Sequence, residues 1–117
     1  MKRLAIAIAT ASMMLAATPA LAHTVVRETS IAENATIARA PATFTVVFSA
    51  ATGLANVTLT DAAGRAVALH YTPPREMAAS FAIPLPALSP GAYTIAWRTI
   101  ARDGHAMPGA IHFTISG

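Results

Sequence analysis

Residues 92–116 read AYTIAWRTIARDGHAMPGAIHFTIS, and they carry the strongest structural signal in the sequence. Apolar residues alternate with small or polar ones on both sides of Asp103-Gly104-His105, which is the pattern of two strands that each bury one face. Asp-Gly is favourable turn chemistry, because glycine reaches the positive-φ conformations that tight turns use. The stretch therefore predicts a β-hairpin whose strands span 92–99 and 110–116 and whose loop holds Asp103-Gly104-His105.

The alternation also predicts which face of this hairpin is buried. Residues of the opposite parity include Arg98 and His112, which we expect at the surface. The alternate positions that we expect to face the core hold the bulky apolar and aromatic side chains, namely Tyr93, Ile95, Trp97, Ile111, Phe113 and Ile115. Packing accounts for all of these, so they are not candidates for chemistry.

The rest of the chain continues as short alternating runs separated by turn residues. The segment 61–64, Asp-Ala-Ala-Gly, suits a type I turn, and the proline-rich stretch 84–91 is a crossing rather than a strand. At most one helical turn is expected, within 32–40. The further candidate strands are 24–28, 42–48, 56–61, 65–71 and 78–83. Together with the hairpin they predict an all-β, antiparallel seven-stranded β-sandwich.

The first 22 residues predict a secretory signal peptide. Lys2 and Arg3 form its positive end, residues 4–15 its apolar centre and Ala20-Leu21-Ala22 its cleavage signal. The apolar centre is too short to span a bilayer. Cleavage after Ala22 leaves one domain of 95 residues, 23–117, for which we expect no membrane insertion.

Composition excludes several functional classes. Residues 23–117 hold six arginines, no lysine and five acidic residues, so their formal charge is +1. No basic cluster with interleaved aromatic residues suggests nucleic acid as a partner. There is no cysteine, hence no disulfide, no thiolate ligand and no thiol nucleophile.

One constellation of side chains points to a metal. Cleavage after Ala22 would make His23 the N-terminal residue, whose α-amine and Nδ1 can close a chelate ring on a metal ion. An imidazole from His105 and a carboxylate from Asp103 would complete a set of three nitrogens and one oxygen. Tetragonal nitrogen and oxygen ligation favours Cu(II).

Each of these residues also has a plainer interpretation, and singly the plainer one is favoured. His23 can simply mark where the peptidase cuts, and Asp103-Gly104 can be a turn with His105 as its solvated neighbour. The sequence alone does not show that the start of the mature chain reaches this loop. We interpret the other two histidines, His70 and His112, as surface residues.

Four stretches of the sequence resemble the CopC family of periplasmic copper-binding, copper-resistance proteins. They are HTVV from His23, FTVVFS, VTLTDAAGRAV and LSPGAYTIAWRTIARDGHAMPGAIHFTI. The resemblance implies a Greek-key sandwich of the Ig-like or cupredoxin-like kind, and a Cu(II) site formed by His23, Asp103 and His105. It also implies a periplasmic location and, as a partner, an inner-membrane copper transport protein of the CopD type.

Methionine content separates this chain from some members of that family, which carry a methionine-rich stretch that binds Cu(I). Residues 52–69, where such a stretch is expected, contain no methionine, and the mature chain has only Met77 and Met107. We interpret both as packing or loop residues, with Met107 as a remote candidate for an axial ligand. Because thioethers select Cu(I), this composition predicts a protein for Cu(II) alone.

The leading hypothesis is therefore a non-catalytic periplasmic Cu(II)-binding protein that serves copper homeostasis or resistance. No pairing of a nucleophile with a base suggests an enzyme. One alternative is a copper monooxygenase of the histidine-brace type, although 95 residues leave little room for a substrate-binding surface. Asp103 would also occupy a coordination position that O₂ chemistry needs open. The other alternative is a metal-free Ig-like interaction module.

Overall fold

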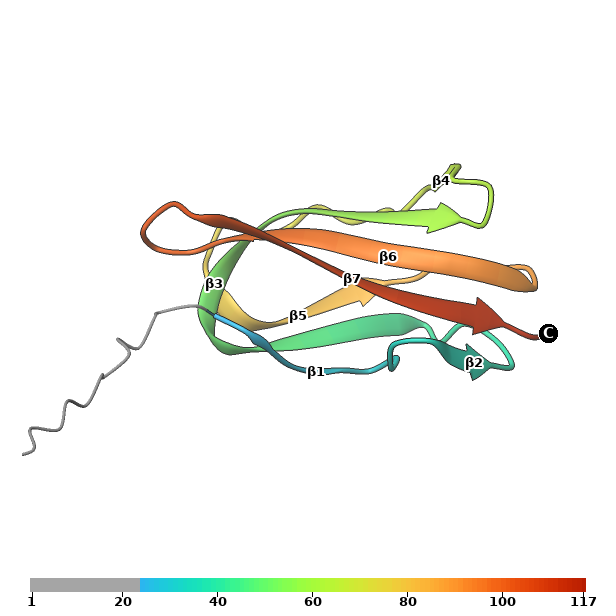
Figure 1. Cartoon of the computed structure of the whole chain (residues 1–117). Coiled ribbons are helices and arrows are strands. Elements are labelled where there is room, and N and C mark those ends of the chain that lie inside the picture. Colours follow the sequence, from blue (N-terminus) through green and yellow to red (C-terminus); the bar gives the residue numbers. More distant parts are fainter. Residues whose placement is uncertain (1–23) are drawn as a thin grey trace, which may run out of the picture.

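Two layers of strands face each other in the computed structural model, which describes residues 24–117 (Figure 1). The predicted signal peptide 1–22 and His23 lie outside the described residues, so the domain boundary at residue 23 stays a prediction. No helix long and apolar enough to cross a membrane occurs in the described part of the chain. The strands are β1 (Val26–Thr29), β2 (Ala35–Ile37), β3 (Thr43–Asp61), β4 (Ala66–Val67), β5 (Ala78–Pro84), β6 (Gly91–Ile100) and β7 (Ala106–Ile115).

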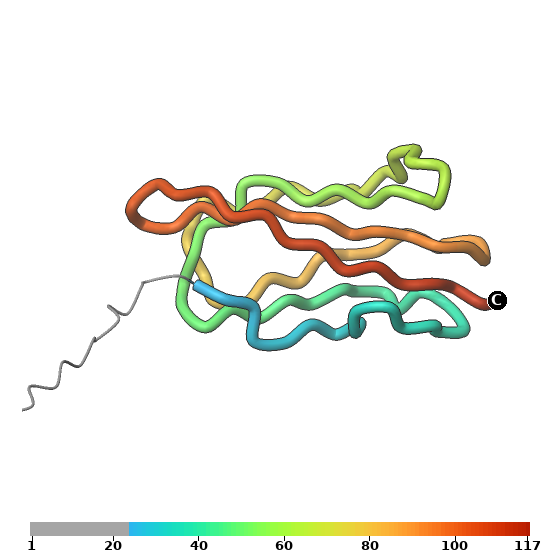
Figure 2. The backbone as a smooth tube through the Cα atoms, viewed as in Figure 1, coloured from blue at the N-terminus to red at the C-terminus, as the bar shows by residue number. Residues whose placement is uncertain are grey.

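Strand β3 belongs to both layers. As far as Thr52 it pairs with β1 and β5, and from Gly53 onward it pairs with β6 and, near its end, with β4. The tube in Figure 2 follows this strand around one end of the sandwich. At the bend the fully buried Thr52 donates its hydroxyl to the carbonyl of Ile100, 3.2 Å away. The bend is therefore tied directly to the end of β6.

Three expectations about the strands were wrong. Residues 42–48 and 56–61, predicted as separate strands, are parts of the continuous β3, which bends at residues that are mostly small without a break in the strand. The predicted strand 65–71 shrinks to β4, and the segment after it contains Pro73 and Pro74, which lack the amide donor of a ladder. The helical turn considered within 32–40 is replaced by β2.

The second layer follows the order β3, β6, β7, β2. All pairs are antiparallel except that of β2 with β7, which is parallel. The all-β, seven-stranded Greek-key sandwich expected from the sequence is thus confirmed, with one parallel pair added at its edge.

The predicted inward face of the β6–β7 hairpin forms much of the core. All six residues assigned to it are buried, while Arg98 and His112 are exposed as expected. Trp97 lies between the layers, with its ring 5.9 Å from that of Phe44 and 6.4 Å from that of Phe48, measured between centroids. The indole therefore joins the two layers close to the bend of β3.

The proline-rich crossing from β5 to β6 is fixed by a tyrosine. Residues 85–90 form no strand, as the sequence predicted, and they carry the chain from one layer to the other. The hydroxyl of Tyr93 donates to the carbonyl of Ser89 at 2.8 Å. This is the tyrosine-corner arrangement of Greek-key sandwiches, in which the phenol satisfies a backbone acceptor a few residues upstream.

A carboxylate holds the β2 segment against β7. One oxygen of Glu33 accepts the backbone N–H of His112 at 2.8 Å, and the other lies 2.9 Å from Nδ1 of the same histidine. The next residue, Asn34, donates its N–H to the carbonyl of His112 at 2.6 Å and adopts a φ of 65°. His112 is therefore a surface histidine, as expected, and it also anchors the edge of the sheet.

We expect Gly109→Ala to destabilise the fold. A methyl group at this inward-facing position would overlap the indole of Trp97, its partner across the β6–β7 ladder. Overpacking of this kind costs about 1–3 kcal/mol. Urea unfolding followed by tryptophan fluorescence measures it, with Ala110→Ser at the neighbouring exposed position as the control. Equal midpoints for Gly109→Ala and the wild type would contradict the packing described here.

The Glu33–His112 contact predicts a pH-dependent contribution to stability. The backbone N–H of His112, and then its ring, hold the pKa of Glu33 below its ordinary value of 4.5. The contribution is therefore fully present above that value and is lost as the pH falls through the lowered pKa of the folded state.

We expect the difference in urea midpoint between wild type and Glu33→Gln to be larger at about pH 5 than at about pH 3. Glu76→Gln is the control, because Glu76 forms no ion pair among residues 24–117. A difference for Glu33→Gln that does not change with pH would show that the carboxylate is not the stabilising form.

Candidate metal site

The loop between β6 and β7 is a tight hairpin turn. Ala101 donates its N–H to the carbonyl of His105, and Gly104 donates to the carbonyl of Ala101, both at 2.9 Å. Gly104 has a φ of +91°, which a residue with a side chain rarely adopts. This is the three-residue hairpin loop in which a turn is followed by glycine in the left-handed region. The predicted hairpin and the role of its Asp-Gly pair are confirmed.

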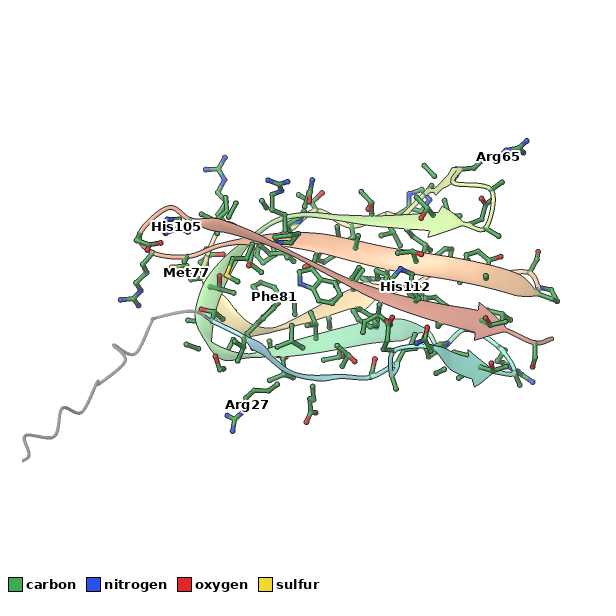
Figure 3. All side chains as sticks on the ribbon, in the orientation of Figure 1. Arg27, Arg65, Met77, Phe81, His105 and His112 are labelled. Atoms are coloured by element: carbon green, nitrogen blue, oxygen red, sulfur yellow. The ribbon has the colours of Figure 1, made fainter. Side chains whose placement is uncertain are left out.

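Within this loop Asp103 holds the imidazole of His105 in place. One carboxylate oxygen accepts the backbone N–H of His105 at 3.0 Å, and the other lies 2.8 Å from its Nδ1. Both side chains are exposed, to 61% for Asp103 and 76% for His105. Figure 3 shows His105 on the loop at the end of the sandwich. Because Nδ1 faces the carboxylate, Nε2 is the ring nitrogen left to bind a ligand.

The contact between Asp103 and His105 also selects one tautomer of the neutral imidazole. The backbone N–H of His105 and then its ring lower the pKa of Asp103, so this carboxyl is ionised at neutral pH. In a neutral ring, a hydrogen bond donated by Nδ1–H to an ionised carboxylate leaves the lone pair on Nε2. Metal-ligating histidines commonly donate their other N–H to a carboxylate in this way, which fixes the tautomer and the ring orientation.

The structure thus shows a contact of Asp103 that the sequence did not suggest. Its carboxylate lies against Nδ1 of His105 and can orient that residue as a ligand. Direct ligation by Asp103 remains a prediction. Among residues 24–117 no group of three histidine, cysteine or acidic side chains is arranged to hold a metal. The predicted third ligand, His23, lies outside this range.

The described chain begins close to the same loop. Thr24, the residue after His23, lines an apolar pocket of about 240 Å³ together with Trp97, Met107 and Pro108. Met107 is two residues beyond His105 in the sequence. In Figure 1 the chain enters β1 at the end of the sandwich that carries the β6–β7 loop. Residues that are 79 positions apart, Thr24 and Asp103, are therefore brought to one end of the molecule by the fold.

The other candidate residues lie apart from this pair. His70 is exposed on the segment that follows β4, and His112 is engaged by Glu33. Met107 is half-buried in the pocket beside Thr24, and Met77 is 36% exposed just before β5. The Glu33–His112 contact joins residues 79 positions apart, so no local pattern in the sequence indicated it.

Comparison with solved structures finds the same fold in other proteins. Two similar solved structures are CopC from Methylosinus trichosporium OB3b and PcoC, a methionine-rich copper resistance protein from Escherichia coli. The first has a TM-score of 0.66 at 20% identity and covers 80% of this chain and 94% of that chain. The second has a TM-score of 0.64 at 24% identity and covers 81% of this chain and 100% of that chain. At these identities both establish the fold.

A comparison with curated proteins found no match. A family model of the CopC domain matches residues 26–116, which is nearly all of the described chain. The match includes the β6–β7 hairpin and its Asp103-Gly104-His105 loop, the features on which the resemblance in the sequence rested most. That resemblance is confirmed, and the chain belongs to the CopC family.

Proposed function

We propose that this protein binds Cu(II) as cargo in the periplasm, to buffer it or to pass it on, without catalysing a reaction. The observation that carries the proposal is the contact between Asp103 and His105, which presents an exposed imidazole with Nε2 free. The family, and the copper resistance protein among the similar structures, support copper as the metal.

The proposed ligand set combines this loop with the start of the mature chain. His105 supplies Nε2, and His23 supplies its α-amine and its imidazole once the signal peptide has been removed after Ala22. The carboxylate of Asp103 orients His105 or adds an oxygen ligand. A set of nitrogen and oxygen donors without thiolate suits Cu(II). The position of Thr24 near the loop supports this pairing.

The exposure of the loop suits a protein that releases its metal. Asp103 and His105 lie at the surface, so a second protein can reach the ion without opening the sandwich. We propose an inner-membrane copper transport protein of the CopD type as the partner. Because the described chain offers Met77 and Met107 on different pockets rather than as a cluster, we propose that Cu(II) is the bound form.

The enzyme alternative finds no support among the described residues. Six of the seven aromatic side chains are buried in the core, and the seventh, Tyr71, packs against it half-buried. The surface around the β6–β7 loop therefore has no exposed aromatic platform on which a polysaccharide could stack. The interaction-module alternative predicts no stoichiometric copper binding, so a metal titration separates it from the proposal.

Two variants test the site: His105→Ala, and an extended protein whose mature chain begins with one added alanine before His23. We expect each to weaken Cu(II) binding by orders of magnitude. The first removes an imidazole and the second converts the α-amine into an amide, so each removes a nitrogen donor. The measurement is a Cu(II) titration with EPR on protein purified from the periplasm, after mass spectrometry has identified its first residue. The control is His70→Ala, another exposed histidine. Unchanged affinity in either test variant would refute the proposed site.

We expect Asp103→Asn to weaken Cu(II) binding by roughly 10–100-fold, the usual effect of losing a carboxylate behind a metal-bound histidine. Asparagine keeps the size of the side chain but loses the charge that fixes the Nδ1–H form of His105. The same titration measures this, and circular dichroism checks that the fold is retained. An affinity equal to that of the wild type would show that the carboxylate neither orients His105 nor binds the metal.

A further inference from the structure

Exposed apolar side chains are concentrated at the end of the sandwich that carries the candidate metal site. The large hydrophobic residues exposed within 24–117 are Val25, Val26, Met77 and Ile100. The β-ladders place all of them around the bend of β3, since Val26 pairs with Phe48, Ala78 with Thr52 and Ile100 with Gly53. Exposed apolar residues that gather in one place mark interaction surfaces more often than scattered ones do.

Two of these residues line a groove next to the loop. It has a volume of about 620 Å³ and lies between the bend of β3, the segment 72–77 and the end of β6. Leu54, Met77 and Ile100 provide apolar surface, and Pro73 and Pro74 form part of one wall. The groove extends to Ala101 and Arg102, the residues immediately before Asp103. It is therefore continuous with the loop that carries His105, and Figure 3 shows Met77 and His105 at the same end.

Two arginines give this groove a positive charge that the described chain does not neutralise. Arg75 and Arg102 both line it and both are exposed. Neither forms an ion pair with a carboxylate of residues 24–117. Asp103, which follows Arg102, already has both its oxygens directed at His105. A guanidinium group at the edge of an apolar groove is suited to bind a carboxylate in a bidentate manner.

We propose that this groove, lined by residues 53–55, 72–75, 77 and 100–102, docks a segment of a partner protein in which acidic side chains alternate with apolar ones. The apolar side chains of the segment contact Met77 and Ile100, and its carboxylates bind Arg75 and Arg102. The inference rests on the proposed function, because docking here would bring the copper-exchanging partner beside His105. The two arginines make an acidic segment, rather than a basic or neutral one, the complementary ligand.

The test uses a defined probe and the copper-free protein. The probe is an eight-residue peptide of alternating glutamate and leucine with blocked ends, titrated into ¹⁵N-labelled protein and followed by amide chemical shifts. We expect shifts confined to 53–55, 72–77 and 100–102, and at least tenfold weaker binding to the double variant Arg75→Gln/Arg102→Gln. The matched control is Arg65→Gln, an exposed arginine at the opposite end of the sandwich (Figure 3).

Several outcomes would overturn the inference. Equal binding of the peptide to the double variant and to Arg65→Gln would do so, as would equal binding of a lysine–leucine peptide. Binding to phosphatidylglycerol vesicles, without peptide binding, that is lost in the double variant would assign the groove to a membrane surface. Concentration-dependent dimerisation lost in Met77→Ser would assign it to a second copy of the chain. Because copper is absent from this experiment, its result is independent of the Cu(II) titration that tests the metal site.

Discussion

The structure depends on a single strand that belongs to both layers. At the bend of β3 a fully buried hydroxyl, that of Thr52, meets the carbonyl of Ile100, so the turn from one layer to the other is fixed against the end of β6. A buried donor and acceptor that hydrogen-bond to each other stabilise this bend, because leaving either group unpaired would cost free energy of folding. The hairpin loop with Asp103 and His105 begins directly after Ile100, at the end of β6. The bend therefore sets the position of the candidate site.

The same hydrogen-bonding arrangement occurs twice: a carboxylate contacts both the backbone N–H and Nδ1 of a histidine. In the β6–β7 loop the partners are two residues apart, and the contact orients an exposed ring at the end of the molecule. At His112 the carboxylate comes from Glu33, 79 positions away, and the contact fastens the edge strand β2 to β7. The geometry is shared, but its surroundings differ. The first pair lies near the start of the described chain, and the second lies on the outer face of the sheet.

One end of the sandwich concentrates the features that favour binding. The β6–β7 loop, the apolar pocket beside Thr24 and the groove lined by Met77 and Arg102 all lie around the bend of β3. The body of the sandwich is closed by packing, with Trp97 bridging the layers and Gly109 leaving room for its indole. The candidate metal site and the proposed docking groove therefore lie at the same end of the sandwich.

Local sequence patterns were enough to predict the β6–β7 hairpin, its inward face with Tyr93 and Trp97, and the turn at Asp103-Gly104. These depend on alternation and turn chemistry within a few residues, which a single sequence displays directly. Three other features became visible only in the folded chain: β3 is continuous, β2 pairs with β7 in parallel, and Glu33 contacts His112. The fold also brings Arg75 and Arg102 to the same groove. Such features depend on contacts between residues far apart in the chain, whose partners no local pattern specifies.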